Sequence, residues 1–178
     1  MHRAILTIFW ALALAATGLA TPADTPDAGR TAKILASARE VMSQARYCAL
    51  ISVDSAGQPQ ARTVDPLPGG DSLDVWVLTN RSSRKIEQLR HNPHATLYYF
   101  CLTKPGYVTL LGEAELIETA AAKALSWRPA WGESLREQIA REEFVLIHIR
   151  PRHLEIVSYA HGLPNDPKTM LPVMLDLP

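Results

Sequence analysis

The chain has no net charge and only two cysteines. Its 18 basic and 18 acidic residues give a formal net charge of zero at pH 7. Proteins that bind nucleic acids usually present a basic surface, so a nucleic-acid partner is not expected. Cys48 and Cys101 each lie inside an apolar run, which favours two buried free thiols, although export would permit a disulfide between them.

The motifs of several common catalytic sites are also missing. The sequence contains no glycine-rich dinucleotide loop and no nucleophile-elbow motif, which removes the usual signs of a dinucleotide-binding enzyme and of a serine hydrolase. No pair among the six histidines has a recognised metal-ligand spacing, so no metal site is expected. No side chain stands out as a general acid or base, and the catalytic residues stay unknown.

The first 20 residues have the pattern of a signal peptide. Arg3 precedes an apolar run from Ala4 to Ala16, and small residues at 18–20 offer a cleavage site. This run is shorter than the roughly 20 residues that a membrane span needs, so an uncleaved anchor is the less favoured alternative. We therefore predict a cleaved signal at 1–20, a flexible leader at 21–30, and an exported protein, periplasmic or secreted, without a membrane span.

Beyond the leader, the sequence predicts one domain at 31–160 and a tail at 161–178. Apolar residues at 31–46 recur with the i, i+3, i+4 spacing of an amphipathic helix, and several later runs are typical of short strands bounded by turn residues. We expect helices at 31–46, 83–91, 118–127 and 134–141, and strands at 47–53, 60–67, 72–79, 95–102, 107–117, 144–149 and 154–159.

The expected fold class is mainly β with helices (α+β), because turns rather than helical crossovers separate most strands. A small antiparallel barrel with helical covers fits this pattern. We expect the first three strands to form a meander and residues 150–153 to form the turn between the last two strands. The tail is expected to pack either on the barrel or across a dimer partner.

Residues 82–85, with the sequence Ser-Ser-Arg-Lys, stand at the expected start of the helix at 83–91. Asn80 or Ser82 is the expected N-cap, and Asn92-Pro93 ends the helix. A helix start has unpaired backbone N–H groups and a positive dipole, so two hydroxyls and two cations there favour a bound anion. The alternative is a solvated cap with two surface charges.

Arg62 lies in the middle of an expected strand, where a guanidinium needs a partner. A phosphate would provide one, and so would a carboxylate of Asp65, Asp74 or Glu113. The residues alone leave both interpretations open.

Five motifs in order resemble the pyridoxamine 5′-phosphate oxidase-like superfamily, and its general stress protein branch in particular. The resemblance spans roughly residues 36–159 and is specific as a set, although each motif by itself is weak. The motifs are Arg62-Thr63-Val64, Val75 to Asn80, Ser83-Arg84-Lys85, Asn92-Pro93 and Leu111-Gly112. The resemblance implies a split β-barrel that forms a homodimer and binds flavin mononucleotide (FMN) at the subunit interface.

The resemblance assigns cofactor-binding roles to nine positions. Four of them would hold the FMN phosphate: Arg62, Ser83, Arg84 and Lys85. Four others would lie along the flavin ring: Thr63 and Val64 through their backbone, and Leu78 and Thr79 from the next strand. The ninth, Tyr107, falls where the true oxidases place a glutamine on the flavin.

The departures from the family pattern limit what the resemblance implies. Leu67 replaces the lysine that holds the substrate phosphate in the oxidases, and their C-terminal arginine–histidine motif is missing. We therefore expect an exported, FMN-binding oxidoreductase with an unknown small-molecule substrate, not an authentic pyridoxamine phosphate oxidase. The alternatives are a binding module for haem or a protein partner that has lost flavin, and a deazaflavin-dependent reductase.

Trp127 and Trp131, on either side of an Arg-Pro-Ala linker, allow two interpretations. They could cover a flavin or a flat substrate, or they could anchor the linker between two helices to the core. Anchoring is favoured, because aromatic side chains beside such linkers usually pack into the core.

Overall fold

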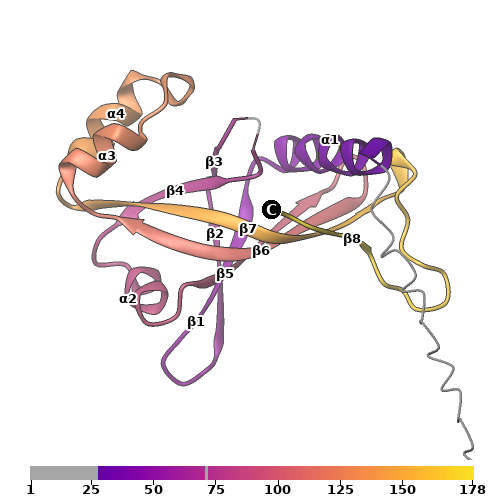
Figure 1. The fold of residues 1–178 in the computed structure, drawn as a ribbon. Coiled ribbons are helices and arrows are strands. Elements are labelled where there is room, and N and C mark those ends of the chain that lie inside the picture. Colours follow the sequence, from indigo (N-terminus) through magenta and orange to yellow (C-terminus); the bar gives the residue numbers. More distant parts are fainter. Residues whose placement is uncertain (1–27, 71) are drawn as a thin grey trace, which may run out of the picture.

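The computed structural model describes residues 28–70 and 72–178, in which a curled antiparallel sheet carries helices at both ends (Figure 1). The helices are α1 (Ala28–Ala45), α2 (Arg84–His91), α3 (Ala120–Ser126) and α4 (Glu133–Ala140), with 3-10 turns η1 (Pro129–Trp131) and η2 (Tyr159–His161). The strands are β1 (Cys48–Val53), β2 (Pro59–Val64), β3 (Leu67–Pro68), β4 (Val75–Asn80), β5 (His94–Cys101), β6 (Gly106–Ile117), β7 (Phe144–Ser158) and β8 (Val173–Asp176).

The predicted signal peptide at 1–20 lies outside the described residues and stays a prediction. Most of the predicted leader at 21–30 also lies outside them, but helix α1 begins at Ala28, within the last part of that range. In the part of the chain that the structure describes, no helix is long and apolar enough to cross a bilayer.

The predicted antiparallel barrel with helical covers is confirmed as a curled half-barrel, and the predicted meander is correct only in part. Its first hairpin is formed by β1 and β2, but the second predicted strand at 60–67 is divided into β2 and β3, of which only β3 pairs with β4, Leu67 opposite Trp76. The sheet has the order β2-β1-β5-β6-β7-β4-β3, and β8 pairs with β7. Strand β4 therefore lies next to β7 and not next to β2. The apolar residues on both faces of β4 explain this place: Val75 and Val77 enter the main core, while Trp76 enters a second cluster on the other face.

The predicted turn at 150–153 is also wrong, because β7 runs through it as one strand of 15 residues. The register with β6 shifts between Leu111, which faces His153, and Gly112, which faces Pro151. Arg152 is the extra residue of this β-bulge. A proline is tolerated at a bulge because the ladder is already interrupted there, so the local turn chemistry did not end the strand.

The main core fills the space between α1 and the concave side of the sheet. Helix α1 contributes Ile34, Ala38 and Val41, each at most 3% exposed. The second cluster lies under the α3–α4 hairpin, where the ring of Trp131 packs 5.6 Å from the ring of Trp76. This contact supports the anchoring interpretation of Trp131.

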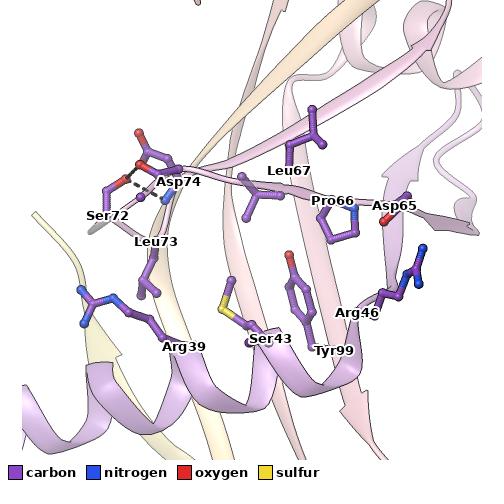
Figure 2. A pocket seen from close by; sticks show the side chains of 14 residues that line it. Arg39, Ser43, Arg46, Asp65, Pro66, Leu67, Ser72, Leu73, Asp74 and Tyr99 are labelled. Atoms are coloured by element: carbon purple, nitrogen blue, oxygen red, sulfur yellow. Dashed lines mark hydrogen bonds between the residues drawn. The ribbon is translucent and has the colours of Figure 1, made fainter. Parts of the chain in front are cut away.

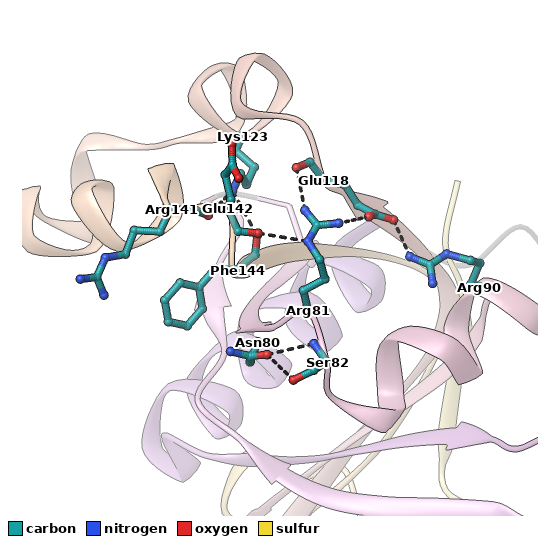
Figure 3. A network of polar contacts seen from close by, with 9 residues as sticks. All are labelled: Asn80, Arg81, Ser82, Arg90, Glu118, Lys123, Arg141, Glu142 and Phe144. Atoms are coloured by element: carbon teal, nitrogen blue, oxygen red, sulfur yellow. Dashed lines mark hydrogen bonds and ion pairs between the residues drawn. The ribbon is translucent and has the colours of Figure 1, made fainter.

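A polar network fastens the α3–α4 hairpin and α2 to the sheet (Figure 3). Glu118, at the end of β6, accepts hydrogen bonds from Arg81 after β4 and, at 2.8 Å, from Arg90 of α2. The bond from Arg90 is the main reason why the pKa of Glu118 is lowered. Buried Lys123 donates to the carbonyl of Arg141, at 2.6 Å, just beyond the end of α4. The contacts of Glu118 join α2 and the segment before it to the end of β6, and the contact of Lys123 joins α3 to the segment after α4.

Cys48 and Cys101 are both buried and free, in agreement with the free-thiol interpretation. The tail returns to its own sheet, where β8 pairs with β7 from His153 opposite Asp176 to Ile156 opposite Val173. The tail therefore packs on the barrel of its own chain, which is one of the two places expected for it.

Candidate anion-binding site

The two outer parts of the sheet meet at α2. Strand β2 is one edge of the sheet, and β4 lies near the other edge. Helix α2 follows β4 after only three residues. The sheet curls until Arg62 of β2 reaches α2, where its Nη2 lies 2.8 Å from Oε1 of Gln88. A strand from one edge of the sheet and a helix that follows a strand near the other edge therefore share one site.

Arg62 is half-buried and satisfied by neutral oxygens. Its Nη1 donates to Oγ of Ser52 at 2.7 Å and, more weakly, to the carbonyl of Leu50 at 3.4 Å. The expected alternative, an ion pair to a carboxylate, is not formed with any described residue. Asp74 is instead bonded to His148 at 3.0 Å. Burial, and then the charge of Arg84, lower the pKa of Arg62.

Lys85 points back from α2 to the end of β4. Its Nζ donates to Oγ1 of Thr79 at 2.7 Å, and that oxygen lies 3.3 Å from Oγ of Ser83. Burial, and then the charge of Arg62, lower the pKa of Lys85. The two cations therefore repel each other across the site, which an anion between them would relieve.

The first turn of α2 has no side-chain cap. The predicted N-cap at Asn80 or Ser82 is wrong, because the cap residue is Ser83 and its side chain makes no capping bond. The side chain of Asn80 accepts instead from the backbone N–H of Ser82 at 2.9 Å. Arg84 is exposed and forms no ion pair with any described residue. A helix start with uncapped N–H groups, two hydroxyls and three cations is suited to an anion.

The residues expected along a ring are only partly directed toward this cluster. Thr63 is exposed and Val64 is buried in the main core, on an edge strand whose outer backbone groups have no strand partner in the described sheet. Thr79 belongs to the cluster through its hydroxyl. The side chain of Leu78 packs in the second cluster with Trp76, on the opposite face of β4. Leu78 can therefore contact a ligand in this site only through its backbone.

Tyr107 does not join the cluster within one chain. Thr79 pairs with Val145 of β7, whereas Tyr107 pairs with Val157, twelve residues further along the same strand. At about 3.3 Å per residue, this separation is about 40 Å of strand. The ring of Tyr107 lies instead 5.5 Å from that of Tyr98, on the outer face of the sheet.

A cavity of about 350 Å³ opens next to the end of β2, between α1 and the segment that follows Val64 (Figure 2). Met42, Leu73 and Tyr99 give it apolar walls, and Arg39 of α1 and Arg46, just after α1, lie at its two ends. Apolar walls with a few polar groups are the usual form of a small-molecule site. This cavity is therefore the candidate place for a substrate.

Two residues of the cluster, Ser52 and Gln88, are not found by reasoning from the sequence motifs. Their signal was present in the pattern of β1, where Ser52 occupies an inward position in line with Cys48 and Leu50. A buried serine among apolar positions requires a hydrogen-bond partner. No group of three or more His, Cys, Asp or Glu side chains that could hold a metal occurs in the described part of the chain.

Comparison with known proteins gives one family match that covers most of the chain. The sequence pattern of the family described as pyridoxamine 5′-phosphate oxidase matches residues 34–158. A pyridoxine/pyridoxamine 5′-phosphate oxidase from Burkholderia thailandensis is 38% identical over 66 residues, which are 37% of this chain and 30% of that protein. The chain thus matches less than a third of the length of this curated relative.

Solved structures with the same fold cover more of the chain at lower identity. General stress protein 26 from Bacillus anthracis has a TM-score of 0.58 and 18% identity, over 81% of this chain and 98% of that one. A pyridoxamine 5′-phosphate oxidase-related, FMN-binding protein from Nostoc punctiforme has a TM-score of 0.53 and 17% identity, over 86% of this chain and 97% of that one. At these identities the likeness shows the shared fold.

Proposed function

The chain belongs to the pyridoxamine 5′-phosphate oxidase family, and on this premise we propose that it binds FMN and acts as an FMN-dependent oxidoreductase on a small-molecule substrate. The observation that carries the proposal is the meeting of Arg62, Arg84 and Lys85 at the start of α2, where none of the three pairs with a carboxylate of the described chain. The FMN-binding description of the Nostoc punctiforme protein, which shares the fold, supports the choice of ligand.

The donor set fits the phosphate end of FMN. A phosphomonoester carries close to two negative charges at neutral pH and accepts several hydrogen bonds, and the site offers three cations, two hydroxyls and a helix start. Bound flavin supplies the redox chemistry, while the chain holds and orients it. The open edge of β2 at Thr63 and Val64 offers backbone groups to a flat ring. Leu67 at the lysine position of the oxidases leaves a phosphorylated vitamin poorly held.

A titration of residues 21–178 with FMN, riboflavin, a deazaflavin and haem tests the proposal. We expect quenching of flavin fluorescence and a perturbed flavin spectrum with FMN, and much weaker binding of riboflavin, which lacks the phosphate. A protein that binds none of the flavins contradicts the proposed function. A Soret band with haem, or tighter binding of the deazaflavin than of FMN, would support the corresponding alternative.

The affinity for FMN should depend on pH through Lys85. Its pKa is lowered in the free protein, and a bound phosphate dianion raises that pKa because it favours the charged amine. Affinity should therefore fall as pH rises through the pKa of Lys85 in the free protein. It should also fall below about pH 6, where the phosphate gains a proton. FMN titrations from pH 5 to 11 measure both effects, and Lys85→Arg should remove the alkaline one, since arginine stays charged.

We also propose that the protein is a homodimer with the cofactor at its interface. The outer face of the sheet is unusually apolar for a solvated surface: Tyr98, Phe100 and Met174 are 37%, 48% and 49% exposed. Residues that pair directly across neighbouring strands point to the same face of a sheet. The pairs that join β5 to β6, β6 to β7 and β7 to β8 therefore place Tyr98 and Met174 on the same face. Tyr107, which one chain alone does not bring to its own site, lies on this face as well, next to Tyr98.

Phe100→Asp should convert the dimer to a monomer and weaken FMN binding, because it places a charge in the middle of the apolar face. Light scattering coupled to gel filtration measures the mass, and an FMN titration measures the loss. The matched control is Leu125→Asp in α3, an exposed leucine away from this face. A wild-type protein that is monomeric with FMN bound contradicts the interface.

A further inference from the structure

Building on the proposed FMN site, we propose that Gln88 and Ser52 are positioning residues: they hold the guanidinium of Arg62 with neutral oxygens and so reserve its charge for a phosphomonoester. The proposal concerns which ligands the site accepts. It predicts a preference for a terminal phosphate dianion over a phosphodiester, which carries one charge, and over an uncharged flavin.

The three side chains form a closed triangle of hydrogen bonds, in which Ser52 and Gln88 are buried and Arg62 is half-buried. Ser52 is 0% exposed and Gln88 is 9% exposed. The hydroxyl of Ser52 donates to Oε1 of Gln88 at 2.7 Å and accepts from Nη1 of Arg62 at 2.7 Å. The same Oε1 accepts from Nη2 of Arg62 at 2.8 Å. Because Oε1 receives two donors, the network also fixes which end of the amide faces Arg62.

The neutrality of this triangle matters for binding. A guanidinium has five N–H donors in a rigid plane, so two neutral acceptors can fix its orientation and leave other N–H groups for a ligand. A carboxylate in the same place would form a charge-assisted pair with Arg62 and compete with an incoming phosphate. Glutamine in place of glutamate therefore separates the orientation of Arg62 from the neutralisation of its charge.

The surrounding charges point the same way. The charge of Arg84 lowers the pKa of Arg62, and the charge of Arg62 lowers the pKa of Lys85, so the three side chains lie close together. Neither Arg84 nor Lys85 forms an ion pair with a described residue. The cluster thus holds three uncompensated cations. A dianion relieves more of their mutual repulsion than a monoanion does, and a neutral ligand relieves none.

Gln88→Glu tests the proposal with almost no change in shape. We expect the affinity for FMN to fall about 30-fold or more, since the new carboxylate pairs with Arg62. Riboflavin affinity should stay unchanged, and the melting temperature should not fall, because the fold gains an ion pair. Gln88→Met, which removes the acceptor and adds no charge, should weaken FMN only about 3-fold. Gln138→Glu, in exposed helix α4, is the matched control for the added charge.

The outcomes separate this proposal from the proposed function. Equal FMN affinity in wild type and Gln88→Glu overturns it, and so does an equal loss of FMN and riboflavin affinity, which indicates a damaged fold. If the wild type fails to bind FMN, the proposed function is overturned, and inorganic phosphate is then the deciding probe. The proposal stands if phosphate raises the melting temperature of the wild type and not of Gln88→Glu, and it falls otherwise.

Discussion

Replacing both Arg62 and Lys85 with alanine is expected to lower the affinity for FMN by about three orders of magnitude, because each charge-assisted hydrogen bond to the phosphate contributes about 2 kcal/mol. The fold should tolerate the change. Arg62 and Lys85 repel each other in the free protein, and Ser52 and Gln88 keep the hydrogen bond that joins them. Fluorescence titration with FMN measures the affinity, and thermal unfolding measures the stability.

The control for this double variant removes two cations elsewhere. Arg136 lies on α4 and Lys168 lies in the tail, and both are exposed and away from α2. Arg136→Ala combined with Lys168→Ala has the same net charge as the test variant, so a general electrostatic effect would appear in both. FMN binding that survives in Arg62→Ala with Lys85→Ala would contradict the phosphate site. Loss of binding in both variants would show that net charge, and not the cluster, controls the affinity.

The anion site was predictable to the extent that it is local in sequence. The sequence places Ser83, Arg84 and Lys85 side by side, and a helix start favours an anion through its free N–H groups and its dipole in any surroundings. The partner of Arg62 was not predictable, because the choice between a phosphate and a carboxylate depends on how the sheet curls. Gln88 meets Arg62 only after β2 and α2, which lie 26 residues apart in sequence at this contact, are brought together.

The fold shows the same division between local and long-range information. The hairpin of β5 and β6 follows from a short turn between two apolar runs, and its pairing is confirmed from His94 opposite Glu113 to Cys101 opposite Gly106. The pairing of β4 with β7 places Val75 opposite Ile149, and nothing in the sequence of either segment indicates that the two strands pair. A proline at 151 carries a strong local turn signal, but the ladder on both sides of the bulge overrides it.

Gly112→Ala is expected to destabilise the protein by about 3 kcal/mol, with a melting temperature about 10 °C lower. A methyl group at Gly112 would overlap the carbonyl oxygen of Arg150 and lie 2.7 Å from its carbonyl carbon and from Cα of Pro151. These are backbone atoms of the bulged strand, which has no flexible side chain to move aside. Thermal and urea unfolding of the wild type and the variant measure the loss.

A second glycine separates this backbone collision from the general effect of adding a methyl group. Gly57, in the β1–β2 turn, has no atom within 4 Å of the place that a Cβ would occupy, and only its φ of 79° opposes alanine. Gly57→Ala should therefore cost about 1 kcal/mol. If the two variants lose equal stability, the close approach of β6 and β7 at the bulge does not constrain position 112. A much larger loss for Gly112→Ala would explain why the position of β6 opposite Pro151 requires glycine.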